Sequence, residues 1–132
     1  MKKIATICVM LLLCNAATAQ NSFSRYVKDW ERAKEFTKEY LEAMPEDGYA
    51  FKPTPEIRSF AGQMYHLADG NLAFVSSATG KKNPIEGSAE KMTDQSKATV
   101  TKVVLESYDF VIAALKGMTE AEWKKKREGF RF

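Results

Sequence analysis

The fold is decided by the stretch Phe51-Lys52-Pro53-Thr54-Pro55-Glu56-Ile57-Arg58-Ser59-Phe60-Ala61-Gly62-Gln63-Met64-Tyr65-His66-Leu67-Ala68-Asp69. A proline-braced loop leads into a helical pattern, and His66, the only histidine of the chain, lies about three turns into it. Thr54 is a suitable N-cap, and proline is tolerated in a first helical turn. We therefore expect this helix to begin near Pro55 or Glu56 and to end by Gly80.

Two further long helical patterns flank this one. The first covers about Ser22 to Met44, with apolar residues at three- and four-residue steps, and stops at Pro45. The other covers about Thr93 to Lys116. Thr119-Glu120-Ala121-Glu122 is a capping-box pattern, which predicts the start of a fourth helix. Strand signals are weak everywhere, so the predicted class is all-α: an antiparallel up-down helix bundle whose fourth helix is short or missing.

Residues 1–19 have the pattern of a cleaved secretory signal. Lys2 and Lys3 precede an apolar run, Ile4–Leu13, and Ala17-Thr18-Ala19 is a small-x-small cleavage site. The run is too short to span a bilayer as a helix, which needs roughly 20 apolar residues. We therefore predict a periplasmic or secreted protein with no membrane span after cleavage.

The remaining residues, 20–132, form one small domain without cysteine. Both cysteines, Cys8 and Cys14, lie in the predicted signal, which excludes a disulfide framework, a zinc ribbon and a cysteine nucleophile from the mature chain. The formal net charge is +3, of which Lys2 and Lys3 contribute two units. Nothing in this balance predicts a nucleic-acid partner.

A turn of about 100° per residue divides the second helix into two strips. The expected core face consists of Phe60, Met64, Leu67, Asn71, Phe74, Val75 and Ala78. His66 lies off that face, among the small residues Ser59, Gly62, Gly70, Ala73 and Ser77. This strip predicts either a closely packed neighbouring helix or a cleft beside the imidazole. Without further context, a lone histidine is more often a boundary residue bonded to a carbonyl than a metal ligand.

Other sources of chemistry are weaker. Three carboxylates are candidates for further metal ligands. Asp69 is one turn from His66 but points about 60° further from the core, and solvated or helix-pairing roles are expected for Glu106 and Asp109. No nucleophile elbow or phosphate-binding glycine loop is found. The basic run Lys124–Arg127 is expected to be a solvated helix face. No catalytic residue is assigned, and the residues alone leave open whether the chain is an enzyme.

The chain resembles the DinB family, which includes damage-inducible DinB-like proteins and related thiol-transferase-like bundles. The resemblance covers essentially all of residues 20–132. It is carried by Phe51–Glu56, Arg58-Ser59-Phe60, Gln63, His66–Asp69, Asn71, Gly80–Pro84 and Ser107–Val111. It implies a four-helix bundle with a divalent-metal site, zinc or nickel, made by three histidines. His66 matches the first of them, whereas the expected His-x-x-x-His pair of the last helix is not in the sequence, so we expect a C-terminally incomplete or shortened relative.

Two functions follow from this resemblance. The first is a metal-dependent hydrolase or small-molecule transferase with His66 as a metal ligand. The alternative is a non-catalytic binding or structural bundle without metal. A small-molecule ligand and a second copy of the chain, in a homodimer, are the partners expected.

Overall fold

The computed structural model describes residues 24–129, and every long element in that range is a helix. The first helix covers 24–43 and is followed by a 3-10 helix, η1 (Glu46–Ala50). Next come α2 (Phe60–Thr79), a second 3-10 helix, η2 (Ala89–Lys91), α3 (Lys97–Lys116) and α4 (Glu120–Gly129). The predicted all-α bundle with a short fourth helix is confirmed. The predicted signal, residues 1–19, lies outside the described residues.

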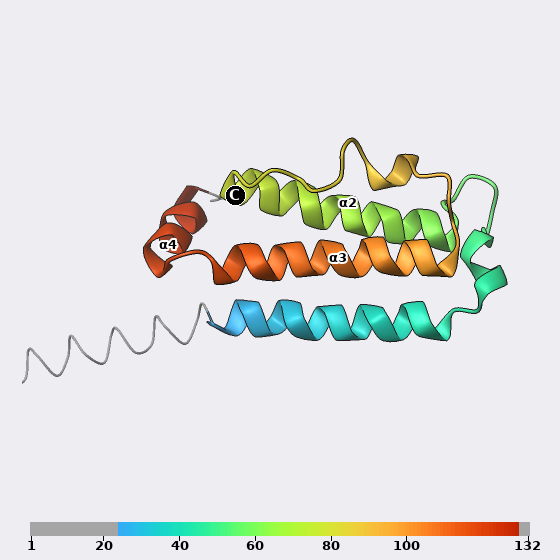
Figure 1. Ribbon diagram of the computed structural model, residues 1–132, viewed down its shortest axis with the longest axis horizontal. Helices are drawn as coiled ribbons and strands as arrows, with labels where there is room; N and C mark the ends of the chain where they lie inside the picture. Colours follow the sequence, from blue (N-terminus) through green and yellow to red (C-terminus); the bar gives the residue numbers. More distant parts are fainter. Residues whose placement is uncertain (1–23, 130–132) are drawn as a thin grey trace, which may run out of the picture.

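The three long helices lie side by side along one axis (Figure 1). The first helix runs antiparallel to α3. Lys34 pairs with Asp109 and Thr37 with Tyr108, so a later residue of the first helix meets an earlier residue of α3. In contrast, α2 and α3 run parallel, since the hydrogen-bonded pairs Ser59–Gln95 and Asn71–Ser107 both span 36 residues. This part of the topology differs from a simple up-down order.

The parallel pair is made possible by a long connection. Residues 80–96, here called the crossover, return along α2 to the end at which that helix began (Figure 1). The crossover contains η2, which packs on α2. Tyr65 of α2 donates a hydrogen bond from its hydroxyl to the carbonyl oxygen of Asp94 at 2.5 Å. The crossover is therefore a packed layer of the domain.

The start of α2 differs from the sequence prediction. Thr54 was expected to cap a helix from Pro55 or Glu56, but Ser59 is the N-cap, and its hydroxyl accepts the backbone N–H of Gly62 at 3.1 Å. The loop before it is closed by the N–H of Phe60, which donates to the carbonyl of Phe51 at 3.1 Å. This closure stacks Phe60 edge-on against the buried ring of Tyr49. The prediction was wrong because a local propensity rule cannot include this contact.

The other helix ends depend on local signals. Gly80 ends α2 in the left-handed conformation, with φ of 74°, as its position predicted. The predicted start of α3 at Thr93 was wrong: its N-cap is Ser96, which accepts from the N–H of Thr99 at 3.4 Å. The capping box before α4 is formed in both directions, since Thr119 accepts from the N–H of Glu122 and Glu122 accepts from the N–H of Thr119.

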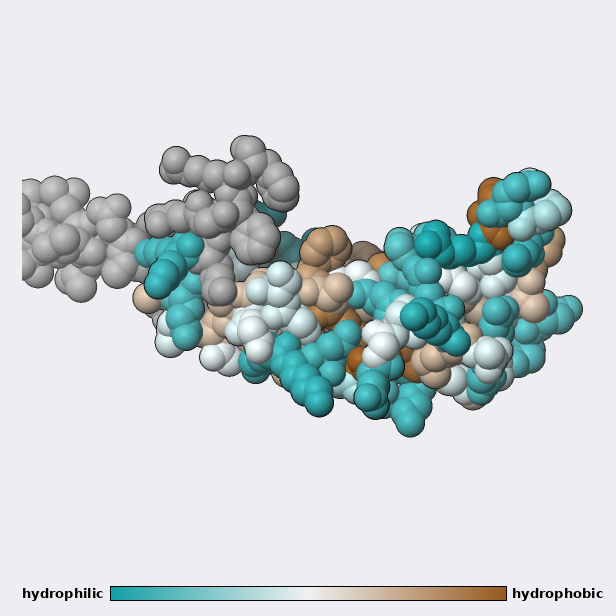
Figure 2. Space-filling model, turned by 90° about the horizontal axis from the view of Figure 1, so that it is seen from above, coloured by the Kyte–Doolittle hydropathy of each residue, from teal (hydrophilic) through white to brown (hydrophobic). Residues whose placement is uncertain are grey.

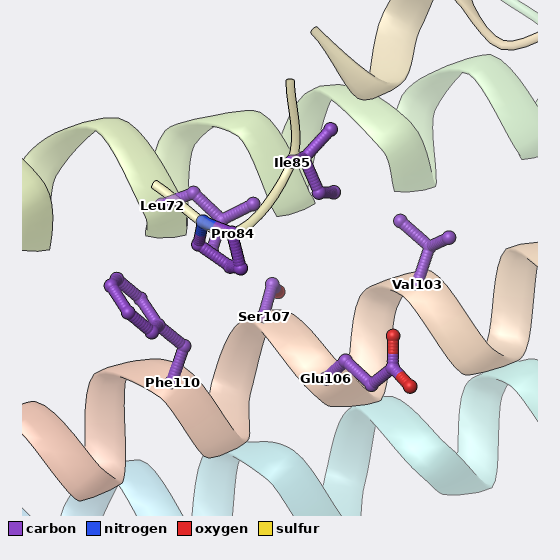
Figure 3. Close-up of a pocket in the computed structure, with 7 residues that line it drawn as sticks. All are labelled: Leu72, Pro84, Ile85, Val103, Glu106, Ser107 and Phe110. Atoms are coloured by element: carbon purple, nitrogen blue, oxygen red, sulfur yellow. The ribbon is translucent and has the colours of Figure 1, made fainter. Parts of the chain in front are cut away.

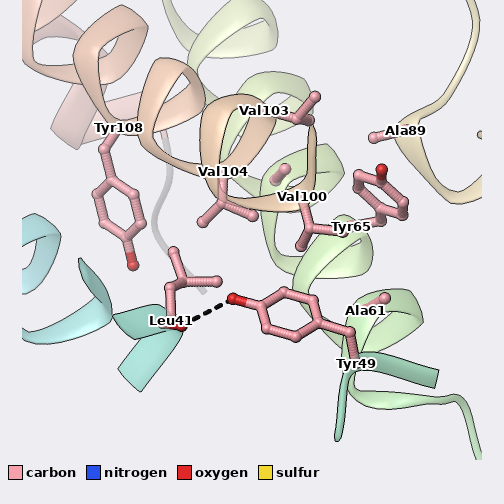
Figure 4. Close-up of a cluster of buried hydrophobic side chains, with 10 residues drawn as sticks. Leu41, Tyr49, Ala61, Tyr65, Ala89, Val100, Val103, Val104 and Tyr108 are labelled. Carbon is pink, nitrogen blue, oxygen red and sulfur yellow. Dashed lines mark hydrogen bonds between the residues drawn. The ribbon is translucent and has the colours of Figure 1, made fainter. Parts of the chain in front are cut away.

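The core lies where the first helix, α2 and α3 meet (Figure 4). Tyr49 reaches into it from η1 and donates to the carbonyl oxygen of Leu41 at 2.8 Å. The buried side chains of α2 are Ala61, Tyr65, Ala68, Asn71, Leu72 and Val75. The prediction therefore placed the centre of the buried face of α2 on the wrong residues. Phe74, which the periodicity placed inside, is 80% exposed.

Both tryptophans, Trp30 and Trp123, pack against tyrosine rings. Trp30 lies edge-on to Tyr108 with ring centroids 5.8 Å apart, and Trp123 lies 4.9 Å from Tyr26. The second contact places α4 across one end of the bundle (Figure 1). None of the helices within residues 24–129 combines the length and apolar composition that crossing a bilayer requires.

Candidate functional site

His66 lies on the outer side of α2, next to the crossover. Its side chain is 52% exposed, and its Nδ1 contacts Oε1 of Glu90. Glu90 belongs to η2 and also accepts hydrogen bonds from Nη2 of Arg58, at 3.3 Å to each carboxylate oxygen. One carboxylate of the crossover thus contacts both Arg58, just before α2, and His66, within α2.

The small residues around His66 are not packed against another helix of the described chain. A methyl group built on Gly62 would meet Ser59 and Arg58, which belong to the same turn, and one on Gly70 would come within 3.9 Å only of Phe74. Ala73 and Ser77 are exposed. Seen from the side of α2 and the crossover, the described surface carries many hydrophilic side chains among intermediate and apolar ones (Figure 2). Within the described residues, the predicted strip is a solvated face and not a helix contact.

Asp69, one helical turn from His66, holds the backbone of η2. Its carboxylate accepts from Ser88 Oγ at 2.5 Å, from the N–H of Ala89 at 2.7 Å and from the N–H of Glu90 at 3.1 Å. Partial burial raises the pKa of Asp69, but these hydrogen bonds lower it more, so the pKa lies below its ordinary value. Asp69 therefore anchors the segment that carries Glu90.

The other two acidic candidates lie apart from this cluster. Asp109 on α3 forms an ion pair with Lys34 of the first helix at 2.6 Å, the helix-pairing role that the sequence predicted. Glu106 lies on α3 at the edge of a hollow of about 250 Å³ between α2, the crossover and α3 (Figure 3). In the basic run, Lys124 pairs with Glu120 on the exposed face of α4 at 3.3 Å.

The hollow beside Glu106 is distinct from the surface around His66. Its walls are mainly apolar and consist of Leu72, Pro84, Ile85, Val103 and Phe110, with Ser107 at its base. The Ser107 hydroxyl already donates to the carbonyl of Val104 and accepts from Asn71. Leu72 is six residues from His66 on α2, so the two point about 120° apart. The hollow is also smaller than a ligand pocket of roughly 300 Å³ or more.

The fold and the His66 cluster define an all-helical bundle in which one exposed imidazole is held by a carboxylate. The sequence profile of the DinB superfamily matches residues 29–130, and the chain belongs to that superfamily. No curated protein and no solved structure gives a significant match.

A divalent metal is the group that this superfamily implies. The described residues do not complete a site for such an ion. Between residues 24 and 129, no three histidine, cysteine, aspartate or glutamate side chains come together in a way that could hold a metal ion. Glu90 and Asp69 approach His66, but Asp69 has three hydrogen bonds to η2 and Glu90 is paired with Arg58. No reaction step through a metal follows from this arrangement.

The sequence did not predict the contact of Glu90 with His66 or that of Glu90 with Arg58. Glu90 is 24 residues from His66, and only the return path of the crossover brings them together. Arg58 was part of the matching motif, but its contact with Glu90 spans 32 residues. A local pattern carries no signal for either contact.

Proposed function

We propose that this chain is an exported DinB-like domain in which His66 provides one ligand of a divalent-metal site, zinc or nickel, of a hydrolase or small-molecule transferase. The observation that carries the proposal is the exposure of the His66 imidazole together with its contact with a carboxylate. His66 is half exposed on the outer side of α2, and one of its two nitrogens is held by a carboxylate, as is common for metal-binding histidines. The further ligands would come from outside the described residues.

Metal analysis of the purified full-length protein tests this proposal. We expect stoichiometric zinc or nickel in the native protein and its loss in His66→Ala. Gln63→Ala is the matched control, because Gln63 is an exposed polar residue one turn earlier on the same helix. Equal metal content in His66→Ala and the native protein would contradict the assignment of His66.

The alternative is a non-catalytic helical bundle without metal. It is favoured by the contacts of the Glu90 carboxylate with both Arg58 and His66, which join the crossover to α2 and give the imidazole a structural role. A metal-free full-length protein, with a melting temperature unchanged by added zinc or nickel, would support this alternative.

Export and self-association are separate parts of the proposal. The pattern of residues 1–19 supports export, and fractionation of cells that express the full-length chain tests it: a product lacking these residues in the periplasm or medium is expected. A homodimer is supported by the exposed aromatic side chains Phe36 and Tyr40 on the first helix and Phe74 on α2. Sedimentation at several protein concentrations tests it, and a concentration-independent monomer would contradict it.

A further inference from the structure

We infer that Glu90 is a positioning residue that fixes the tautomer of His66, keeping the proton on Nδ1 and leaving the lone pair of Nε2 available to a metal or another electron-pair acceptor. The inference rests on the proposed function only for the identity of that acceptor. The tautomer itself follows from contacts within the described residues.

The first step is the chemistry of the contact. Glu90 is paired with the Arg58 guanidinium, and an ionised carboxylate only accepts hydrogen bonds. His66 contacts Glu90 through Nδ1, so Nδ1 must carry the proton. A neutral imidazole has one protonated and one unprotonated nitrogen, so the proton on Nδ1 leaves Nε2 as the electron-pair donor.

The second step is access to Nε2. None of the hydrogen bonds among residues 24–129 involves this atom, and 52% of the His66 side chain is exposed. Gly62 and Gly70, one turn before and one turn after His66, have no side chain that could cover the ring.

The third step is the support of Glu90 itself. Asp69 binds the backbone N–H of Glu90 and of Ala89, which fixes the position of η2 along α2. Arg58 binds the Glu90 carboxylate from the other side. A carboxylate held at both its backbone and its head group orients the ring with little loss of side-chain entropy, and such partners raise the basicity of a ligating imidazole.

The single histidine makes the test direct. Nitrogen-15 spectra of the imidazole contain the signals of His66 alone. At pH about 8.5, roughly two units above the ordinary imidazole pKa of about 6.5, the ring of free histidine is neutral and mainly protonated on Nε2. In the metal-free native protein we expect one tautomer, protonated on Nδ1. In Glu90→Ala we expect the mixture found for free histidine.

Two further variants separate positioning from a general structural effect. Glu90→Gln keeps an oxygen acceptor and is expected to preserve most of the Nδ1–H tautomer. Arg58→Ala removes one of the two supports of Glu90 but leaves its carboxylate in place, and is expected to lower the Nδ1–H fraction less than Glu90→Ala does. A native ring protonated on Nε2, or a Glu90→Ala spectrum identical to the native one, would overturn the inference.

Metal titration distinguishes this inference from the proposed function. If the full-length protein binds zinc through His66, Glu90→Ala is expected to weaken zinc binding about 10- to 100-fold. If the protein binds no zinc while the tautomer spectra behave as described, the proposed function fails and the positioning role of Glu90 stands.

Discussion

Asn71 of α2 donates a hydrogen bond from Nδ2 to the hydroxyl of Ser107 of α3 at 3.1 Å, and both residues are buried. Ser107 in turn donates to the carbonyl of Val104 at 2.7 Å. The pair sets the parallel register of α2 and α3, because any slip along the helices would leave a buried amide without a partner.

Removing this pair is therefore expected to destabilise the domain. Asn71→Ala should lower the free energy of unfolding by about 1–3 kcal/mol, since it leaves a gap and removes a hydrogen bond between helices. Urea unfolding measures this loss. A double-mutant cycle with Ser107→Ala should give a coupling of about 0.5–1.5 kcal/mol, and a coupling indistinguishable from zero would refute the role in register.

Leu72 and Phe74 test which face of α2 is buried. Leu72 is 1% exposed, so Leu72→Ala is expected to cost about 2–5 kcal/mol of unfolding free energy. Phe74 is 80% exposed, so Phe74→Ala should change it by no more than about 0.5 kcal/mol. Thermal and urea unfolding of the two variants decide the matter. The reverse order of effects would restore the face that periodicity predicts.

Asp69 is expected to make stability depend on pH. Its pKa in the folded state lies below the ordinary value of 3.8, so its ionised form stabilises the fold above that value. This contribution is lost as the pH falls through the folded-state pKa. Asp69→Asn should therefore be less stable than the native protein near neutral pH, and the gap should close below pH 3.8. Asp47→Asn, at an exposed position of η1, serves as the control in unfolding experiments across pH.

Tyr49 contributes a buried hydroxyl at the end of the first helix. Tyr49→Phe removes the hydrogen bond to the carbonyl of Leu41 and should cost about 0.5–1.5 kcal/mol. Tyr40→Phe is a matched control because Tyr40 is 71% exposed. Urea midpoints of the two variants give the comparison, and equal midpoints would show that the Tyr49 hydroxyl contributes nothing to stability.

The sequence by itself determined the elements whose signals are local. Apolar spacing predicted three long helices, Gly80 predicted the end of α2, and Thr119 with Glu122 predicted the start of α4. Each of these signals acts within a turn or two, where backbone hydrogen bonding and capping dominate. The histidine that matches the superfamily was also visible in the sequence.

Only the tertiary structure decided how these elements are arranged. The crossover makes α2 and α3 parallel, which turns Phe74 outward and brings Glu90 onto His66. The helical period shows that α2 has an apolar side but not which part of it meets α3 and which meets solvent, because burial depends on the partner and not on the period. The surroundings of His66 come from a segment 24 residues away, and no local pattern encodes that return path.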